Sequence, residues 1–250
     1  MRFGVFIPPG PGPFPVVWCL AGLTCTEETF AMKAGAQAAA SRLGLMLITP
    51  DTSPRGEGVA EDAAYDMGQG AGFYLDATQA PWATHFRMRA YLERELPQLI
   101  AAMFPVDMTR QGILGHSMGG HGAMTMALRN PSRFTAISAF APIASPMNCP
   151  WGVKALSRYL GGDRSTWRAY DACALLDDGA RVADLLVDQG QDDQFLIEQL
   201  QPGLLEASCA RAGVPLTLRR QAGYDHSYWF IQTFIDDHLA WHAERLGRPG

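Results

Sequence analysis

The sequence predicts an α/β protein in which helices cover both faces of a mostly parallel sheet. Short β-forming runs alternate with longer runs of helical spacing through most of the 250 residues, which is typical of that architecture. Hydrophobic residues make up 48% and charged residues 18%, so the chain has enough apolar material for a sizeable core. Because α/β proteins of this length often fold as one unit, a single domain over residues 1–250 is expected.

Each expected element follows from a local pattern. Seven short apolar runs are expected to form strands, at residues 3–7, 16–21, 45–49, 112–114, 136–140, 185–187 and 216–219. Five longer stretches are expected to form helices, at residues 27–42, 87–104, 118–129, 194–212 and 227–246. Residues 50–84 and 142–184 resist assignment, and a loop of such length inside a compact domain is usually functional.

Charge and apolar content exclude several classes of protein. The formal net charge is −5, whereas a surface that binds nucleic acid normally shows a basic excess. The longest apolar runs, residues 16–21 and 43–48, are far shorter than the roughly 20 residues that span a bilayer. Pro8 and Pro9 interrupt the N-terminus before an apolar signal segment forms. Neither nucleic acid nor a membrane is therefore an expected partner, and no secretory signal is predicted.

The cysteines are odd in number and widely spaced. They are Cys19, Cys25, Cys149, Cys173 and Cys209. None belongs to a C-x-x-C pair, so they are expected to be reduced thiols in a cytoplasmic protein, with neither a disulfide framework nor a bound metal.

The strongest local motif is GHSMG at residues 115–119, a G-x-S-x-G pattern between an expected strand and an expected helix. In such an elbow the flanking glycines let the backbone turn sharply, and the turn presents the hydroxyl of Ser117 to solvent. The backbone N–H of Met118 then begins the helix, where an oxyanion is favoured. The motif predicts a nucleophilic serine.

A serine nucleophile needs a base and a carboxylate, which in hydrolases with this elbow follow it in that chain order: serine, acid, histidine. His226 lies on the loop between the last strand and the last helix, and is the candidate base. Spacing alone leaves Asp188, Asp192 and Asp193 open as the acid. Asp225 adjoins His226 in sequence and is poorly placed to reach the same ring.

The other histidines have simpler explanations. His116 and His121 flank the nucleophile and are expected to pack or hydrogen-bond near the elbow. His238 and His242 lie four residues apart on a helix without the glutamate of a zinc-protease motif, so a solvated helix face is expected. His85 is expected to be a loop residue.

The second oxyanion donor is expected on the loop after an early strand. The sequence there is GLTCT at residues 22–26, and the backbone N–H of Leu23 is the candidate, although a helix-capping turn at Thr26 would also explain these residues. Cys25 is either a reactive thiol near a helix N-terminus or a small buried side chain.

Seven blocks in order resemble the S-formylglutathione hydrolase (esterase D) family. They are GLTCT at 22–26, PDTSPRG at 50–56, GAGFY at 70–74 with DAT at 76–78, GHSMGGHG at 115–122, AFAP at 139–142, DQG at 188–190 with DDQF at 192–195, and GYDHSY at 223–228. The resemblance runs from about residue 2 to about residue 245, and the blocks together are far more specific than any one alone.

The resemblance implies a cytoplasmic α/β-hydrolase, commonly a homodimer, that cleaves S-formylglutathione to glutathione and formate without a cofactor. The family's nucleophile, acid and base fall on Ser117, Asp193 and His226, and its oxyanion donors on Leu23 and Met118. A carboxylesterase or acyltransferase with the same triad is the alternative, and a non-catalytic hydrolase-fold scaffold is a third, disfavoured possibility.

The ligand-binding residues are less defined. The loop of residues 50–84 and Trp151 are expected to wall the pocket. Lys33 and Arg55 are candidates to meet an acidic substrate, although cations of this kind are more often solvated. Relatives in the family begin with residues that precede the segment matching Met1, so the N-terminal edge of the sheet is expected to be shortened.

Overall fold

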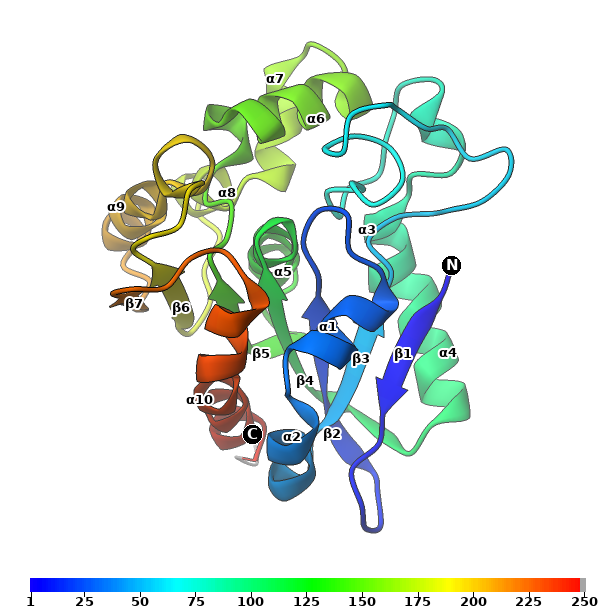
Figure 1. Cartoon of the computed structure of the whole chain (residues 1–250), viewed down its shortest axis with the longest axis vertical. Coiled ribbons are helices and arrows are strands. Elements are labelled where there is room, and N and C mark those ends of the chain that lie inside the picture. The colour runs from blue at the N-terminus through cyan, green and yellow to red at the C-terminus, as the bar shows by residue number, and fades with distance from the viewer. Residues whose placement is uncertain (248–250) are drawn as a thin grey trace.

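The structure is a computed structural model that describes residues 1–247 (Figure 1). Its strands are β1 Phe3–Phe6, β2 Phe14–Leu20, β3 Met46–Pro50, β4 Val106–His116, β5 Phe134–Phe140, β6 Leu185–Gly190 and β7 Leu216–Gln221. They form one sheet in the order β1-β3-β2-β4-β5-β6-β7. β1 pairs antiparallel with β3, and every other pairing is parallel. The predicted mostly parallel α/β sheet is confirmed, with a strand at each of the seven expected places.

Helices connect the strands. They are α1 Glu27–Lys33, α2 Gln37–Leu43, α3 Met88–Ala90, α4 Leu96–Met103, α5 Met118–Arg129, α6 Pro150–Leu160, α7 Arg164–Trp167, α8 Ala172–Asp177, α9 Pro202–Ala212 and α10 Tyr228–Leu246. A π-helical turn at Tyr91–Glu95 joins α3 to α4, so the helix expected at 87–104 is present with one irregular turn.

Two expected helices are each broken into two pieces. The helix predicted at 27–42 ends after α1, because Gly35 has a φ of 67°, a left-handed conformation that stops a helix. The helix predicted at 194–212 is interrupted at Gln201, whose φ is 48°, and the chain restarts at Pro202. Proline disfavours a helical conformation in the residue before it and has no N–H to donate. Both predictions of a single helix are therefore wrong at these points.

The sheet lies between two layers of helices. In Figure 1, α1, α2 and α10 lie in front of the sheet, while α4 lies behind it. α1 packs on β1 and β3, α10 packs on β4 and β5, and α5 packs on the three central strands β2, β4 and β5. The inner strands are the most buried, and β2 and β3 hold only one half-buried residue between them, whereas β1 and β7 at the two edges are half-buried or exposed along their length.

The two segments that resisted assignment meet above the carboxyl ends of the strands, where Figure 1 shows residues 51–81 beside α6 and α7. The buried hydroxyl of Tyr159 on α6 accepts a hydrogen bond from the N–H of Gly68 at 3.0 Å and donates one to the carbonyl of Ala71 at 2.8 Å. These bonds fix the long loop onto α6. The loop is thus an ordered cover over the strand ends.

No helix within residues 1–247 is long and apolar enough to cross a bilayer. β1 is the outer strand on its side of the described sheet. That this edge is shorter than in the family stays a prediction, as does the single domain over residues 1–250.

Candidate active site

Ser117 occupies a strained turn between β4 and α5. Its φ of 58° and ψ of −120° lie where non-glycine residues are rare, and such strain is typical of a nucleophile elbow. A Cβ on Gly115 would lie 2.1 Å from the carbonyl oxygen of Gly119, and a Cβ on Gly119 would lie 2.1 Å from that of Leu20. The glycines of the motif are therefore required by close backbone approach. The N–H of Ser117 donates to the carbonyl of Phe140 at 2.9 Å, which ties the turn to β5.

His226 follows β7 and is held by Asp193, which follows β6. Nδ1 of His226 lies 2.6 Å from Oδ2 of Asp193. The carboxylate is fully covered, and its other oxygen accepts a hydrogen bond from the N–H of Phe195 at 2.8 Å. Gln189 adds a donor to Oδ2 at 3.3 Å. Because an ionised carboxylate only accepts hydrogen bonds, the arrangement places the ring proton on Nδ1 and leaves Nε2 as a base.

The other carboxylates considered lie elsewhere. Asp188 is buried in a bidentate ion pair with Arg219, at 2.5 and 2.6 Å. Asp192 and Asp225 are exposed. The structure therefore brings Asp193 to His226, whereas spacing in the sequence left three aspartates open.

Two backbone donors border the nucleophile. Leu23 follows β2 and lines the same cavity as Ser117, and a Cβ on Gly22 would lie 3.2 Å from the Cβ of Ser117. Met118 is the first residue of α5. No hydrogen bond within residues 1–247 uses the N–H of Leu23 or of Met118. Both donors are thus available to a developing oxyanion.

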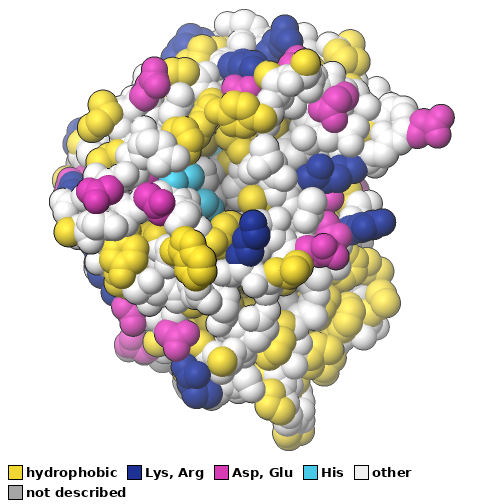
Figure 2. Space-filling view, in the orientation of Figure 1, with side chains coloured by type: hydrophobic (Ala, Val, Ile, Leu, Met, Phe, Trp, Pro, Cys, Tyr) yellow, Lys and Arg dark blue, Asp and Glu magenta, His cyan; other side chains and the backbone are white. Residues whose placement is uncertain are grey.

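A cavity of about 150 Å³ opens at these residues. It is lined by Gly22, Leu23, Thr24, Cys25, Tyr65, His116, Ser117, Trp151, Phe195 and His226. Figure 2 shows histidine side chains at the bottom of a hollow on this face. The lining carries no carboxylate and no Lys or Arg, so an uncharged group fits it best.

Aromatic rings form one wall of the cavity. The indole Nε1 of Trp151 donates to the hydroxyl of Tyr65 at 3.0 Å. The ring of Phe195 lies 4.6 Å from that of Trp151 and 5.1 Å from that of His226, measured between centroids. Trp151 thus lies where the sequence placed it, at the pocket. Tyr65 belongs to the loop of residues 50–84 that was expected to wall the pocket, although the residue itself was not singled out. Phe195 was missed: it stands in the DDQF block, but nothing in its spacing marked it as a wall residue.

Cys25 lines the cavity, but its surroundings disfavour a reactive thiolate. Burial raises the pKa of the thiol, against the nearby side chains of Thr29 and Tyr228 that lower it. A higher pKa leaves less thiolate at neutral pH. Of the two explanations that the sequence left open, the small and largely buried side chain fits better.

His116 and His121 pack near the elbow, as expected. Burial, reinforced by the neighbouring charge of His226, holds the pKa of His116 well below its ordinary value, so this ring is neutral at pH 7. It lies 4.6 Å from the ring of His226 and 5.5 Å from that of Tyr228. His121 bonds through Nε2 to the carbonyl of Phe73 at 3.3 Å.

The expectation of a solvated face at His238 and His242 is wrong, since both side chains are completely buried. His238 stacks on Phe140 at 3.8 Å, and Nε2 of His242 lies 2.9 Å from the hydroxyl of Ser138. They belong to the face of α10 that packs on the sheet. Within residues 1–247, no group of three His, Cys, Asp or Glu side chains is placed to hold a metal ion.

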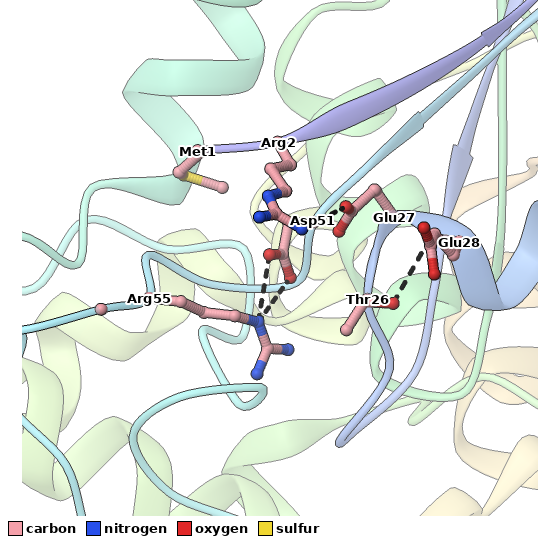
Figure 3. A pocket seen from close by; sticks show the side chains of 8 residues that line it. Met1, Arg2, Thr26, Glu27, Glu28, Asp51 and Arg55 are labelled. Carbon is pink, nitrogen blue, oxygen red and sulfur yellow. Dashed lines mark hydrogen bonds and ion pairs between the residues drawn. The ribbon is translucent and has the colours of Figure 1, made fainter.

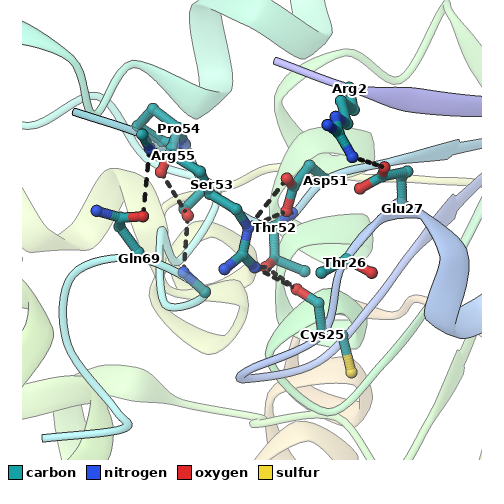
Figure 4. Close-up of polar contacts among 12 residues, drawn as sticks. Arg2, Cys25, Thr26, Glu27, Asp51, Thr52, Ser53, Pro54, Arg55 and Gln69 are labelled. Carbon is teal, nitrogen blue, oxygen red and sulfur yellow. Dashed lines mark hydrogen bonds and ion pairs between the residues drawn. The ribbon is translucent and has the colours of Figure 1, made fainter. Parts of the chain in front are cut away.

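A separate cavity of about 520 Å³ lies beside the β2–α1 loop, where Arg55 stands (Figure 3). Nε of Arg55 lies 3.1 and 3.0 Å from the two oxygens of Asp51, and the guanidinium also donates to the carbonyl of Cys25 at 2.8 Å (Figure 4). Arg2 approaches Glu27 at 4.0 Å. The positive charge of Arg55 is therefore already used to brace the loop that carries the candidate oxyanion donor.

This structure is an α/β-hydrolase. It combines a mostly parallel sheet with a serine at the strand-to-helix turn, Ser117, and with an imidazole held by a carboxylate, His226 and Asp193. The chain belongs to the esterase family, because the family model named Esterase matches residues 1–241. It is similar to the S-formylglutathione hydrolase of Paracoccus denitrificans (strain Pd 1222), with 53% identity over 249 residues, 99% of this chain and 89% of that protein.

Solved structures agree. An S-formylglutathione hydrolase from Agrobacterium tumefaciens is 54% identical with a TM-score of 0.97, covering 98% of this chain and 90% of that one. FphF, a fluorophosphonate-binding serine hydrolase of Staphylococcus aureus, has a TM-score of 0.74 at 20% identity and covers 96% of this chain and 91% of its own. The second likeness extends to the fold alone.

Proposed function

We propose that this chain hydrolyses S-formylglutathione to glutathione and formate, with Ser117 as nucleophile, His226 as base and Asp193 as its orienting acid. One observation carries the proposal: His226, whose Nδ1 lies 2.6 Å from Asp193, borders the cavity of Ser117 in a chain 53% identical to the Paracoccus S-formylglutathione hydrolase. The uncharged, small cavity suits a formyl thioester.

The chemistry runs in two steps. Nε2 of His226 takes the proton of Ser117 as Oγ attacks the formyl carbon, and the N–H groups of Leu23 and Met118 stabilise the oxyanion. The carbon–sulfur bond then breaks, glutathione leaves with the proton from His226, and a formyl ester remains on Ser117. Water attacks this ester, again giving its proton to His226, and formate leaves as Oγ regains a proton. Asp193 stabilises the imidazolium formed in each step.

Substitution of the nucleophile tests the proposal. Ser117→Ala is expected to lower kcat for S-formylglutathione at least 10³-fold, because the covalent route is lost. Ser132→Ala, on an exposed turn, is the matched control and is expected to stay within twofold of the parent. Activity of Ser117→Ala within tenfold of the parent would remove Ser117 from the mechanism.

The carboxylesterase alternative is separated by substrate range. The parent's kcat/KM for S-formylglutathione is compared with those for 4-nitrophenyl acetate and 4-nitrophenyl butyrate. We expect the thioester to be preferred and butyrate to be the poorest, because the cavity of about 150 Å³ leaves little room for a longer acyl chain. A preference for butyrate favours the alternative. Labelling of Ser117 by a fluorophosphonate separates an enzyme from a non-catalytic scaffold.

A cytoplasmic location and a homodimer belong to the same proposal. Both are carried over from the family resemblance, and the Cys25 environment is compatible with a reduced thiol. Sedimentation of the purified protein over a concentration series measures the oligomeric state.

A further inference from the structure

A third cavity, of about 610 Å³, lies between the end of α1 and the start of α10. It is lined by Met32, Lys33, Ser227, Tyr228, Trp229 and Gln232. This cavity adjoins the candidate active site, because Ser227 directly follows His226 and the ring of Tyr228 lies 5.5 Å from that of His116. In Figure 2, hydrophobic and basic side chains stand beside the hollow that holds the histidines, over the start of α10 and the end of α1.

Lys33 gives this third cavity an uncompensated positive charge. No carboxylate within residues 1–247 lies within 4.0 Å of its ammonium group, and none of the lining residues is acidic. Its charge reaches the active-site cavity, where it lowers the pKa of Cys25 against the effect of burial. Arg55, the cation on the other side of the active site, is held by Asp51. Of these two cations, Lys33 is therefore the one that has no carboxylate partner within residues 1–247.

Two large apolar side chains line the same cavity as Lys33. Met32 is 78% exposed and Trp229 is 77% exposed, which is unusual for side chains of this size. A cation beside an exposed indole favours a ligand that has an anionic end and flat amide groups that can lie against the ring. Glutathione fits that description, since its chain carries two planar amide groups, and at neutral pH it has two carboxylates and one ammonium group and therefore a net charge of about −1.

We propose that Lys33 and Trp229 form the subsite for the glutathionyl part of the substrate, which deepens the function proposed above and rests on it. The ammonium group of Lys33 binds one glutathione carboxylate, and the indole of Trp229 covers the peptide stem. The thioester sulfur belongs to the central cysteine of glutathione, so each arm extends about 7 Å beyond it, toward the cavity that begins at Ser227, the residue after His226. The acyl group and the thiol part of the substrate thus occupy different cavities.

Lys33→Gln tests the subsite. We expect kcat/KM for S-formylglutathione to fall about threefold to tenfold through KM, with kcat nearly unchanged, because an exposed ion pair with a bound substrate is lost. Activity toward 4-nitrophenyl acetate, which has no carboxylate, is expected to stay the same. Lys33→Arg should restore most of the loss. The control is Arg42→Gln, which removes an equal charge from α2, where Arg42 pairs with exposed Asp236.

Two inhibitors that differ only at their carboxylates test whether Lys33 binds a glutathione carboxylate. S-methylglutathione and its dimethyl ester are measured as competitive inhibitors of the parent and of Lys33→Gln. The subsite predicts that Lys33→Gln weakens inhibition by the free acid severalfold and leaves inhibition by the ester unchanged. Equal weakening of both ligands, or of neither, overturns the subsite.

The failure of the subsite differs from the failure of the function. If the parent prefers S-formylglutathione and Lys33→Gln behaves like the parent, the subsite is overturned and the function stands. If the parent itself shows no preference for the thioester, the proposed function fails. If Lys33→Gln and Trp229→Ala instead shift the protein from dimer to monomer in sedimentation and leave KM unchanged, a second copy of the chain covers this face and the subsite is overturned.

Discussion

Two aspartate–histidine pairs take their aspartates from β6 or from the loop directly after it. The pairs consist of the same two kinds of side chain but differ in their access to a cavity. Asp193 lies on the loop after β6 and holds His226, whose ring borders a cavity. Asp188 lies within β6, 3.5 Å from His238, and both side chains are completely buried. The contrast shows that an imidazole and a carboxylate in contact do not by themselves make a catalytic pair; access to a substrate cavity decides it.

The inner pair, Asp188 and His238, stabilises the fold. In the β6–β7 register Asp188 stands opposite Arg219, and the guanidinium binds both carboxylate oxygens. Burial alone would raise the pKa of Asp188, but the neighbouring ring of His238 and the hydrogen-bonded guanidinium of Arg219 hold it below its ordinary value. Burial lowers the pKa of His238, which opposes the attraction of the carboxylate. The inner histidine is thus a neutral packing group, fixed against Phe140.

The largest expected effect is a loss of kcat on substitution of Asp193, the acid of the outer pair Asp193–His226. Asp193→Asn should lower kcat about 10⁴-fold with the fold intact, because an amide can donate to Nδ1 and leave the ring in the wrong tautomer. Asp192→Asn, one residue earlier and exposed, should change kcat less than twofold. Steady-state kinetics with S-formylglutathione measures both. Equal effects of the two substitutions would contradict the assignment of the acid.

The inner pair should respond in stability and not in catalysis. Asp188→Asn is expected to lower the free energy of unfolding by about 2 kcal/mol, because Arg219 loses its buried partner but stays 31% exposed to water. Asp237→Asn removes the exposed partner of the same guanidinium and should cost less than about 0.5 kcal/mol. Urea unfolding at pH 7 gives both values. A large loss of kcat in folded Asp188→Asn would transfer the catalytic role to the inner pair.

The sequence was most informative where local geometry and chemistry coincide. The elbow was predicted from five residues because close backbone approach demands glycine at 115 and 119. The strands were predicted because each is a short apolar run. The choice of Asp193 came only from the family resemblance, since neighbouring carboxylates have equal spacing and differ in the direction that each faces after folding.

The error at His238 and His242 is instructive, because a signal was present. Ile231, Ile235, His238 and His242 recur at helical spacing on the buried face of α10, so periodicity marked the histidines as core positions. The prediction of a solvated face rested on the polarity of histidine and not on this helical spacing. Phe195 carried no such signal, and the loop of residues 50–84 was expected at the pocket without Tyr65 being singled out, because the contacts of loop residues depend on the whole fold.

The smallest expected effect is a pH dependence of stability that arises from these buried histidines. Burial, with the nearby charges of His238 and Arg245, lowers the pKa of His242 to about 3. An unfolded histidine titrates near 6.5, so below that pH the unfolded state binds a proton that the folded state refuses. The stability is therefore fully present above about pH 6.5 and falls as the pH drops, by at most about 1.4 kcal/mol per pH unit for this residue.

His242→Gln isolates this contribution, because glutamine can still bond Ser138 but does not titrate. Urea unfolding at pH 7, 6 and 5 should show a shallower loss of stability in His242→Gln than in the parent, by about 1 kcal/mol per unit between pH 6 and 5. His85→Gln, on an exposed loop, should leave the slope unchanged. Identical slopes for His242→Gln and the parent would mean that His242 takes up its proton in the folded state as readily as in the unfolded chain, which its complete burial against Ser138 argues against.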